Sequence, residues 1–423
     1  MLKLKSGVTA DEVISLRLGK DLLLSIAGTS DSVFVSNFFW DDYIYNSYAI
    51  LQGVEFADGS RWDMEQIKAG AMIGTAASET LRGTIESERI VGDGGEDVLL
   101  GLDGNDELDG GDENDQLYGG NGEDGLYGGA GNDVLYGERG SDVLEGGSGD
   151  DVLYGGIGDD VYVFGKGDGK DVIAGEFYHW WDGGVGYNVL KLKSGVTADE
   201  LSLTRIGDGL VLSIEGAEDV ITASNFFYDN NPGNGYNTLQ EIRFADGSSW
   251  NMAAMLKTKG LTGTAGADGL AGSDWSDTIS GLAGDDALYG LGGDDLLIGG
   301  LGNDQIIAGN GSDFLIGGAG NDQLFGGFGS DVYSFGRGDG ADVIVDNDVE
   351  PGKFNRLNFG DDVAPSDVVA SQEGDDLVLA ILQSSDSVRV VDFYRSASPL
   401  NPCNSIQEIG FADGSVWGLS HFI

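Results

Sequence analysis

Aspartate recurs at every ninth residue along two long stretches of the sequence, a spacing at which carboxylates could bind cations together. In GGAGNDVLY (128–136), glycines occupy positions 1, 2 and 4 and the acid occupies position 6. Carboxylates stacked at a strand spacing of about 4.8 Å would repel one another unless cations lay between them. The candidate ligands at position 6 are Asp97, Asp106, Asp115, Asp124, Asp133, Asp142, Asp151 and Asp160 in the first stretch, and Asp268, Asp277, Asp286, Asp295, Asp304, Asp313, Asp322 and Asp331 in the second.

Calcium is the cation that best suits these residues, because it takes roughly six to eight oxygen ligands from carboxylates and backbone carbonyls. Glycine permits positive φ angles and tight turns, so the GGxGxD segments expose such carbonyls. One large apolar residue per unit makes a thin core. That core alone should not offset about 1–2 kcal/mol of entropy for each ordered backbone residue. The sequence therefore predicts that bound calcium stabilises the turns.

The elements that position these acids are short strands repeated with a period of nine. Ten units run without a gap from Gly74 to Val163, and eight more run from Gly263 to Ser334. The last three positions of each unit suit a strand whose middle side chain points inward and whose neighbours point outward. The predicted inward residues are Leu81, Ile90, Leu99, Leu108, Leu117, Leu126, Leu135, Leu144, Leu153, Tyr162, Leu270, Ile279, Leu288, Leu297, Ile306, Leu315, Leu324 and Tyr333.

A second, longer repeat surrounds the two blocks of nonapeptides. LKLKSGVTADE occurs at 2–12 and again at 190–200, and a weaker third copy begins at Leu357. Each copy ends in FADGS-x-W, at 56–62, 244–250 and 411–417. Apolar alternation in LSLTRIGDGLVLSI (201–214), interrupted by Gly-Asp-Gly, predicts a β-hairpin. We expect a short helical turn at VTADE and little other helix.

The nonapeptides resemble the G-G-x-G-x-D-x-U-x calcium repeats of RTX proteins, and the flanks resemble the haemolysin-type calcium-binding related domain of large RTX proteins. Together the two resemblances cover nearly the whole chain. They imply parallel β-rolls with two nonapeptides per coil and calcium ions between loops two repeats apart. Asp133 would then share ions with Asp115 and with Asp151. The resemblance implies roughly a dozen ions in all.

We therefore predict an all-β fold in which two calcium-binding parallel β-rolls alternate with three small β-rich flanking domains. YNV precedes the second copy of LKLKSGVTADE, so Met1 is predicted to lie inside a repeat and the first flank to be truncated. The predicted boundaries are 1–72 for the first flank, 73–176 for the first roll, 177–260 for the second flank, 261–346 for the second roll and 347–423 for the third flank.

Units at the ends of each block depart from the pattern. GTAASETLR (74–82) and GTIESERIV (83–91) carry glutamate and lack the inner glycines, so they are predicted to be ion-free caps. GSDWSDTIS (272–280) also lacks inner glycines, which weakens the prediction for its aspartate. Each block ends in a similar segment whose acids either complete the last ion or cap the roll, and these are further candidate ligands: Asp168, Asp171, Asp339 and Asp342.

Outward side chains suggest two surfaces. Tyr118, Tyr136 and Tyr154 should form a ladder, which either stabilises neighbouring strands or provides a sugar-binding or partner-binding platform. The even-numbered units of the second block place apolar residues outward, and we expect a flanking domain or another chain to cover them: Leu296, Ile298, Phe314, Ile316 and Val332. HWWDGG (179–184) is predicted to be an interface or linker cluster.

Composition excludes several functions. With 72 acidic and 22 basic residues, the net charge is −50, so nucleic acid and anionic membranes are not expected as direct partners. A single cysteine, Cys403, excludes an internal disulfide framework. Neither a membrane-spanning apolar run nor an N-terminal signal peptide is found. Because H-E-x-x-H, G-x-S-x-G, P-loop and complete EF-hand motifs are also missing, no catalytic residue is predicted and the chain is expected not to be an enzyme.

The predicted function is calcium binding coupled to folding, because an acidic, glycine-rich chain is expected to be disordered without the ion. The RTX resemblance implies a protein of a Gram-negative bacterium that leaves the cell through the type I secretion machinery and folds outside. Two alternatives remain open. The chain could be the non-catalytic C-terminal part of a secreted toxin or hydrolase. It could instead be an adhesin segment that binds a host-surface or glycan partner.

Overall fold

The computed structural model describes residues 1–18, 20–39, 51–175, 186–233, 236–346, 348, 352–394 and 405–422. Cys403 and the segment 179–184 lie outside the described residues, so the predictions made for them stay untested. The chain divides into two compact units. Unit 1 contains Met1–Leu201, Leu212–Phe226 and Gly235–Ser249, and unit 2 contains Ser202–Val211, Phe227–Asn234 and Trp250–Ile423.

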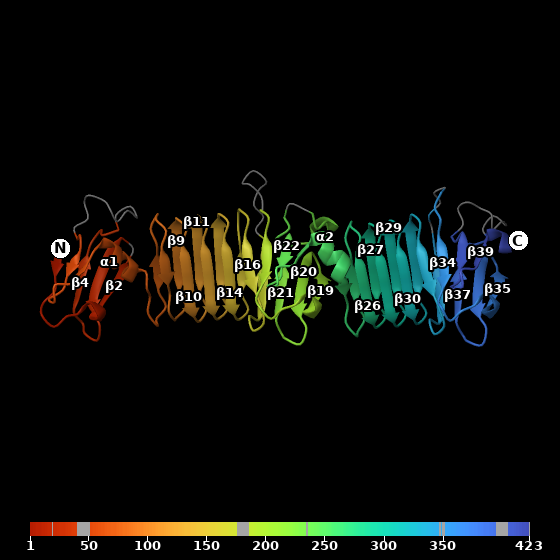
Figure 1. Ribbon diagram of the computed structural model, residues 1–423, viewed down its shortest axis with the longest axis horizontal. Coiled ribbons are helices and arrows are strands. Elements are labelled where there is room, and N and C mark those ends of the chain that lie inside the picture. Colours follow the sequence, from red (N-terminus) through yellow and green to blue (C-terminus); the bar gives the residue numbers. More distant parts are fainter. Residues whose placement is uncertain are drawn as a thin grey trace. The chain divides into compact units, whose positions relative to one another are not determined.

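The nonapeptides of unit 1 form a parallel β-roll in which successive repeats alternate between two sheets (Figure 1). Each strand pairs in parallel with the strand two repeats away, so that Leu117 lies opposite Leu135 and Leu108 lies opposite Leu126. This confirms two nonapeptides per coil. One sheet contains β7 (Thr80–Arg82), β9 (Val98–Asp103), β11 (Gln116–Asn121), β13 (Val134–Arg139), β15 (Val152–Tyr154) and β17 (Lys170–Ile173), and the other contains β8 (Arg89–Val91), β10 (Glu107–Asp112), β12 (Gly125–Ala130), β14 (Val143–Ser148) and β16 (Val161–Phe164).

Unit 2 contains a second roll with the same arrangement. Leu297 lies opposite Leu315 in one sheet, and Ile306 lies opposite Leu324 in the other. The first sheet contains β24 (Leu261–Thr262), β26 (Thr278–Ala283), β28 (Leu296–Leu301), β30 (Phe314–Ala319) and β32 (Val332–Phe335), and the second contains β25 (Gly269–Ala271), β27 (Ala287–Gly292), β29 (Gln305–Asn310), β31 (Gln323–Phe328) and β33 (Ala341–Val345).

Strands in both rolls are longer than the repeat pattern predicts. Most central strands have six residues, because the chain stays extended through the first three positions of the next repeat. The reason lies in the register: Tyr118 and Gly120 both pair with residues of β13. The turn is therefore confined to positions 4 to 6, and the position 1 glycines lie inside strands.

The core of each roll is a column of single apolar side chains. All eighteen predicted inward residues are buried, from Leu81 to Tyr162 in unit 1 and from Leu270 to Tyr333 in unit 2. One large apolar side chain per repeat lies in this core, and Ala308 adds a small one. The column continues into the following flank, where the buried Leu190 lies opposite Tyr162 and the buried Leu357 lies opposite Tyr333.

The flanks following each roll extend its sheets. In unit 1, β16 pairs in parallel with β18 (Val189–Leu192), which pairs with β22 (Glu241–Arg243), and β17 pairs with β21 (Val220–Ala223). The same connections recur in unit 2, where β32 pairs with β34 (Arg356–Phe359) and β33 pairs with β37 (Ser387–Val390). The remaining flank strands of unit 2 are β35 (Val368–Glu373), β36 (Asp376–Ile381), β38 (Glu408–Gly410) and β39 (Val416–Gly418).

The first flank contains two separate three-stranded sheets and a helix. Helix α1 (Met64–Ala71) begins at a capping box in which Asp63 accepts from the Gln66 N–H and the Gln66 side chain accepts from the Asp63 N–H. The sheets are β1 (Leu2–Lys3), β5 (Val54–Glu55) and β6 (Arg61–Trp62), and β2 (Val13–Leu18), β3 (Asp21–Ile26) and β4 (Ser32–Val35). The corresponding hairpin of the second copy is formed by β19 (Leu201–Ile206) and β20 (Gly209–Ile214).

Helix is scarce, as predicted. VTADE forms a 3₁₀ turn at Ala10–Glu12 and again at Ala198–Glu200. β23 (Ser249–Asn251) is followed by α2 (Met252–Ala254) and a π-helical turn at Met255–Lys259. Among the described residues, no helix combines the length and apolar character needed to cross a membrane.

The two outward surfaces differ in character. The rings of Tyr118, Tyr136 and Tyr154 stack with centroids 4.8 Å apart and planes within 6° of parallel, so the ladder forms as predicted.

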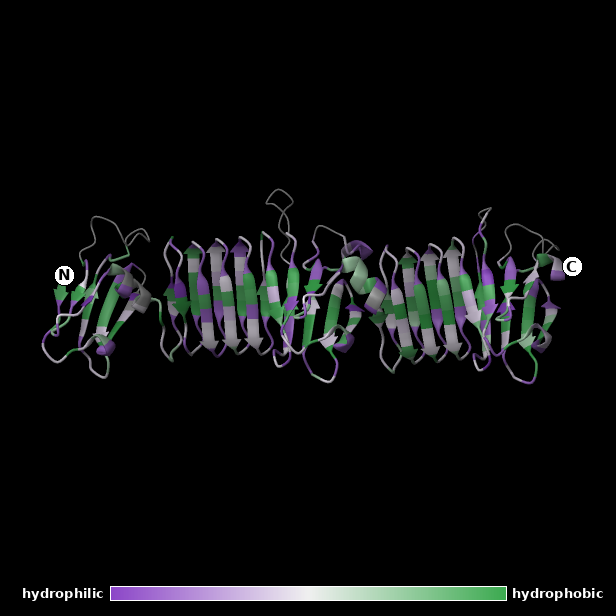
Figure 2. Cartoon of the chain, viewed as in Figure 1, coloured by the Kyte–Doolittle hydropathy of each residue, from purple (hydrophilic) through white to green (hydrophobic). Residues whose placement is uncertain are grey.

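Hydrophobic bands cross the strands of the roll in unit 2 (Figure 2). Phe314 and Ile316 are half-buried there. The described strands of the third flank extend the two sheets through β34 and β37. Coverage of this face by a flanking domain or by another chain stays a prediction.

Candidate metal sites

The position 6 aspartates form a hydrogen-bonded ladder along each roll. The backbone N–H of Asp115 donates to Asp133 Oδ1 at 2.8 Å, and the N–H of Asp133 donates to Asp151 Oδ1 at 2.8 Å. The same contact recurs throughout unit 2, for example from the Asp286 N–H to Asp304 Oδ1 at 2.9 Å. Each bond joins residues two repeats apart and fixes the orientation of one carboxylate, leaving its second oxygen to other partners.

That second oxygen is buried and has no hydrogen-bond donor among the described residues. An unpaired buried charge is unfavourable, so each oxygen requires a proton or a cation. The atoms are the Oδ2 atoms of Asp97, Asp115, Asp124, Asp133, Asp142, Asp151, Asp160, Asp171, Asp286, Asp295, Asp304, Asp313, Asp322, Asp331 and Asp342, together with Oδ1 of Asp277.

A backbone carbonyl lies beside several of the unpaired carboxylate oxygens. A side-chain carbon added at Gly128 would collide with both Asp133 Oδ2 and the carbonyl oxygen of Gly146. The same pair of oxygens, one carboxylate and one carbonyl from two repeats further on, lies beside Gly110, Gly137 and Gly299. Glycine at position 1 therefore leaves space next to two hard oxygen ligands.

These oxygens fit calcium better than a softer metal. Among the described residues, no three His, Cys, Asp or Glu side chains gather in a metal-binding cluster. Zinc would require such a set of side chains, whereas calcium accepts backbone carbonyls together with few carboxylates. The donor set therefore agrees with the predicted cation and places its ligands at the turns.

Burial controls the protonation of this ladder when no ion is bound. Burial raises the pKa of Asp133 and Asp142 to about 7, against the lowering effect of the backbone hydrogen bonds that each accepts. Burial and the nearby Asp151 charge raise the pKa of Asp171 to about 8. In unit 2, burial raises the pKa of Asp295 and Asp342 to about 8. Without a cation, protons would compete for these carboxylates near neutral pH.

A second ladder at position 5 is not predicted by the sequence analysis. Asn132 N–H donates to Asn114 Oδ1 at 2.7 Å, and Asp150 N–H donates to Asn132 Oδ1 at 2.8 Å. In unit 2 the Asn303 N–H donates to Asp285 Oδ1 at 2.7 Å. Here the upstream side chain accepts, opposite to the position 6 ladder. The prevalence of Asn, Asp and Ser at position 5 is the sequence signal that could have revealed it.

The first units of each roll satisfy their acids without an ion. The Thr75 N–H and hydroxyl both donate to Glu79, and Thr84 makes the same contacts with Glu88. The structure thus shows how two units predicted to be ion-free cap the roll. Asp268, predicted as a ligand, resembles them, because its Oδ2 accepts from the Thr264 N–H at 2.6 Å and from the Thr264 hydroxyl at 2.9 Å.

Asp277 shares features with the acids that accept hydrogen bonds from their own turn and with the ladder acids that have an unpaired buried oxygen. Its Oδ2 accepts from the Ser273 N–H at 2.6 Å and hydroxyl at 3.0 Å, whereas its buried Oδ1 lacks a hydrogen-bond donor among the described residues. Burial raises its pKa to about 6, and the Ser273 hydrogen bonds and the Arg205 charge lower it.

The four candidate acids that follow the two rolls, two after each, divide into two kinds. Asp171 Oδ1 and Asp342 Oδ1 accept from the N–H groups of Asp151 and Asp322, so these two residues continue the position 6 ladder. Asp168 and Asp339 instead fold back on their own turns. Asp168 Oδ2 accepts from the Gly165 N–H at 2.8 Å, and Asp339 Oδ2 accepts from the Gly336 N–H at 2.6 Å.

The other column of each roll ends at an asparagine that the sequence analysis missed. Asn188 Oδ1 accepts from the Asp160 N–H at 2.9 Å, and Asn355 Oδ1 accepts from the Asp331 N–H at 2.8 Å. A neutral side chain therefore takes the last ladder position in both rolls. The signal was the shared Asn before an apolar strand in YNVL and FNRL, which the nonapeptide period does not reach.

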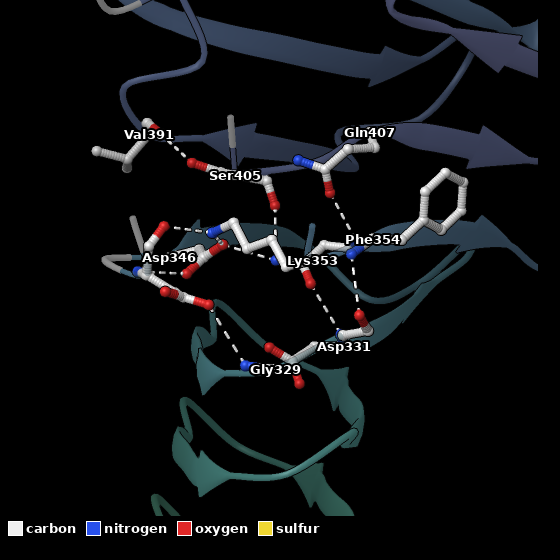
Figure 3. Close-up of polar contacts among 11 residues, drawn as sticks. Gly329, Asp331, Asp346, Lys353, Phe354, Val391, Ser405 and Gln407 are labelled. Carbon is white, nitrogen blue, oxygen red and sulfur yellow. Dashed lines mark hydrogen bonds and ion pairs between the residues drawn. The ribbon is translucent and has the colours of Figure 1, made fainter. Parts of the chain in front are cut away.

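A buried lysine lies next to the asparagine that ends the ladder of the second roll (Figure 3). Lys353 Nζ forms an ion pair with Asp346 Oδ2 and donates to the Asp348 carbonyl at 2.5 Å. Both charged side chains are almost fully buried, at 2% and 0% exposed. Asn355 Nδ2 donates to the same Asp346 oxygen at 2.6 Å and to the Ser405 carbonyl at 3.0 Å. In the first roll, Lys193 Nζ pairs with Asp168 Oδ2 at 2.9 Å and with Glu145 at 2.7 Å.

Comparison with known families gives two matches. The RTX calcium-binding nonapeptide repeat matches overlapping windows within 73–171 and 262–341. The haemolysin-type calcium binding protein related domain matches residues 21–66, 210–254 and 376–420. A search of curated protein sequences gave no significant match.

Two solved structures are similar to parts of the chain. The extracellular lipase LipA from Serratia marcescens has 17% identity and a TM-score of 0.19 over 70% of this chain. The AlgE6R3 subunit of the Azotobacter vinelandii mannuronan C5-epimerase has 27% identity and a TM-score of 0.22, covering 36% of this chain and 82% of that one. The chain spans 42% of the length of the lipase. From the two family matches and the β-rolls, the chain is a protein of RTX haemolysin-type calcium-binding repeats that alternate with haemolysin-type calcium binding protein related domains.

Proposed function

We propose that this chain is a non-catalytic, calcium-binding segment of a secreted bacterial protein and that it folds on calcium outside the cell after type I secretion. The observation that carries the proposal is the row of buried carboxylate oxygens with no hydrogen-bond donor among the described residues. Several of them, such as Asp133 Oδ2, lie beside a backbone carbonyl, so a cation would complete the site. The RTX repeats support calcium as that cation.

The electrostatics support a folding switch. The chain has a net charge of −50, and folding brings its position 6 carboxylates into columns. In the absence of ions, the cost of burying these groups favours an unfolded, hydrated chain at neutral pH. A ligand that binds only the folded state shifts the equilibrium toward it. Extracellular calcium modules bind with dissociation constants of about 10⁻⁴ to 10⁻³ M, which suits folding after export.

The residues that would hold the ions are the ladder aspartates with an unpaired buried oxygen. Bound calcium would supply positive charge between the two oxygens beside each position 1 glycine. Asp133 would contribute its Oδ2, and the Gly146 carbonyl would face it. The proposal depends least on three acids whose carboxylates already accept hydrogen bonds from their own turns: Asp268, Asp168 and Asp339. The proposed total remains roughly a dozen ions.

The test is far-UV circular dichroism of metal-stripped protein during a calcium titration, with magnesium as the control. We expect a cooperative gain of β signal with calcium only, because magnesium requires octahedral geometry and dehydrates reluctantly. Asp133→Asn and Asp150→Asn form a matched pair, since both remove one charge but Asp150 is exposed at position 5. Of the two variants, only Asp133→Asn should need a higher calcium concentration to reach the midpoint of the β-signal gain. Full β structure in chelator would contradict the proposal.

A partner-binding role is the second candidate, and one surface favours it. A depression of about 390 Å³ lies beside the tyrosine ladder and is lined by Tyr118, Leu102 and the polar groups of Asn121, Glu138 and Arg82. Apolar rings next to hydrogen-bonding groups are typical of ligand sites. Binding to a glycan array that is retained in calcium and lost in Tyr118→Ser would support an adhesin role, and unchanged binding in that variant would contradict it.

A further inference from the structure

We propose that Arg17 and Arg205 take the place of a calcium ion at the first turn of each roll, so that the preceding flank supplies a permanent positive charge from which the ion-dependent repeats continue. This inference rests on the proposed calcium-dependent folding and goes beyond it. It assigns a specific task to the β-hairpins of the flanks.

At the start of each roll, one position 1 carbonyl has no upstream aspartate with which it could share a cation. Inside a roll, the carbonyl of a position 1 glycine lies beside the aspartate oxygen two repeats upstream, as the Gly146 carbonyl lies beside Asp133 Oδ2. The second unit of each roll starts at Gly83 or Gly272. Two repeats upstream of these units, the position that would correspond to the aspartate is Gly70 or Lys259. Both residues precede the first nonapeptide of their roll. Neither of these two carbonyls can therefore share an ion with an upstream aspartate of its own roll.

Arg205 reaches this carbonyl in unit 2. Its Nη1 donates to the Gly272 carbonyl and lies 3.4 Å from the Ala271 carbonyl. Its Nη2 donates to Asn230 Oδ1 at 2.6 Å, and its Nε donates to the Gly207 carbonyl at 2.8 Å. One cation is thus surrounded by four oxygens, three of them backbone carbonyls, as a calcium ion would be.

The positive charge of this arginine is shielded from solvent at the start of the ladder. The Oδ1 of Asp277, the first buried ladder acid of unit 2, has no hydrogen-bond donor among the described residues. The guanidinium lies over the Phe227 ring at 4.6 Å, and the side chain is only 9% exposed. Arginine stays protonated in proteins, so this positive charge does not depend on pH or on calcium.

Arg17 repeats the arrangement in unit 1. Its Nη1 donates to the Gly83 carbonyl, its guanidinium lies 4.4 Å over the Phe39 ring, and the residue is 2% exposed. The third copy of the flank has Gln372 at the equivalent position. That side chain is exposed and donates to the Gly374 carbonyl in its own hairpin. Arginine is therefore found in the two copies that precede a roll within this sequence.

The experiment measures the calcium dependence of hydrogen exchange in each roll of the full chain. The variants are Arg205→Gln, which removes the charge, and Arg205→Lys, which keeps it. Arg389→Gln is the matched control in the same unit, where the arginine pairs with Glu373 and Asp376 at a partly exposed site. The roll of unit 1 serves as an internal reference, and Arg17→Gln is the reciprocal variant.

In Arg205→Gln, protection of β24, β26 and β28 should require roughly three- to tenfold more calcium, because charge-assisted hydrogen bonds are lost. Arg205→Lys should retain most of the wild-type midpoint, and the roll of unit 1 should be unaffected. Arg17→Gln should shift only the roll of unit 1. Complete loss of protection in the unit 2 roll of Arg205→Gln, with retention in Arg205→Lys, would also support the inference.

Three results would overturn the inference. The first is equal shifts in Arg205→Gln and Arg205→Lys, which would show that packing and not charge matters. The second is a shift in Arg389→Gln as large as that in Arg205→Gln. The third is an equal shift of both rolls in Arg205→Gln. Failure of the proposed function would be recognised separately, since the wild-type rolls would then be protected in chelator.

Discussion

At the scale of single residues, position 6 carries the chemistry because its two oxygens have different surroundings. Asp133 Oδ1 accepts a backbone N–H from Asp115, and its Oδ2 is buried beside the Gly146 carbonyl. One oxygen thus fixes the side chain and the other remains for a cation. Glycine is required nearby for the same reason, since a Cβ at Gly128 would fill the space between the two ligand oxygens.

The metal-free rolls should lose stability as the pH rises from about 4 to about 8. Burial raises the pKa of Asp133 and Asp142 to about 7 and that of Asp171 to about 8, from an ordinary value of 3.8. A carboxyl whose folded pKa is raised binds more protons when folded, so the free energy of unfolding falls with increasing pH in this window. Far-UV circular dichroism in chelator should show more β structure at pH 5 than at pH 8.

Two controls accompany the pH experiment. Calcium at pH 8 should restore the β signal, because the ion replaces the protons at the ladder. Light scattering at pH 5 should show that the signal does not come from aggregates, since the sequence pI is near 4.1. The same β content at both pH values in chelator would mean that these carboxyls do not govern folding.

At the scale of elements, each strand is too small to be stable alone and depends on its neighbours two repeats away. A strand such as β13 buries one leucine, Leu135, and pairs in parallel with β11 and β15. Two ladders of side-chain hydrogen bonds, at positions 5 and 6, join the loops along the same direction as the strand pairing. Folding should therefore propagate from repeat to repeat, as in other repeat proteins.

The tyrosine ladder should contribute to the free energy of unfolding of the first roll. The faces of the Tyr136 ring lie against Tyr118 and Tyr154 at 4.8 Å, so Tyr136→Ser removes two stacked pairs. At about 0.5–1.5 kcal/mol for each pair, the free energy of unfolding in saturating calcium should fall by about 1–3 kcal/mol. Urea unfolding measures this loss.

Tyr127→Ser is the matched control for the ladder. Tyr127 lies on the other sheet of the same roll, opposite Asp109 and Glu145, and is 37% exposed. Its replacement should cost less, because no aromatic ring lies opposite it in either neighbouring strand. Equal losses in the two variants would show that stacking adds nothing beyond the burial of one ring.

At the scale of the whole molecule, the net charge opposes folding, and in the proposed function bound ions would reverse that effect. The 423 residues carry 72 acids against 22 bases, and the acids of position 6 are brought together only in the folded rolls. The flanks counter this locally with buried cations, Lys353 in unit 2 and Arg17 in unit 1. These few charges cannot neutralise the columns, so under the proposed function bound calcium would supply most of the compensation.

Salt should compact the metal-free chain without folding it. Self-repulsion of the −50 chain is screened as the Debye length falls from about 30 Å at 0.01 M salt to about 3 Å at 1 M. Small-angle scattering in chelator should therefore show a smaller radius of gyration at high sodium chloride. Far-UV circular dichroism should stay unchanged, because monovalent ions do not complete the ladder sites. A salt-induced gain of β signal would show that screening alone is sufficient for folding.

The nine-residue period by itself determined the column of core residues and the position of the ladder acids. Leu135 and Asp133 could be assigned from spacing because every interior repeat has the same neighbours, so one local rule applies to all of them. The longer strands, by contrast, depend on pairing: Gly120 becomes part of β11 because it lies opposite Glu138 of β13. The position 5 ladder likewise depends on contacts between loops 18 residues apart.

The ends of the rolls were decided only by the tertiary structure. Arg17 and Gly83 are 66 residues apart in the sequence, and Asp160 and Asn188 are 28 apart, so no period relates them. Where the repeats stop, the carbonyls and carboxylates of the terminal turns have no neighbouring repeat. Their hydrogen-bond and ion-pair partners are therefore side chains of the flank. A repeat pattern specifies its own interior, because neighbours there are copies of each other, but the residues that terminate it follow from the three-dimensional path of the chain.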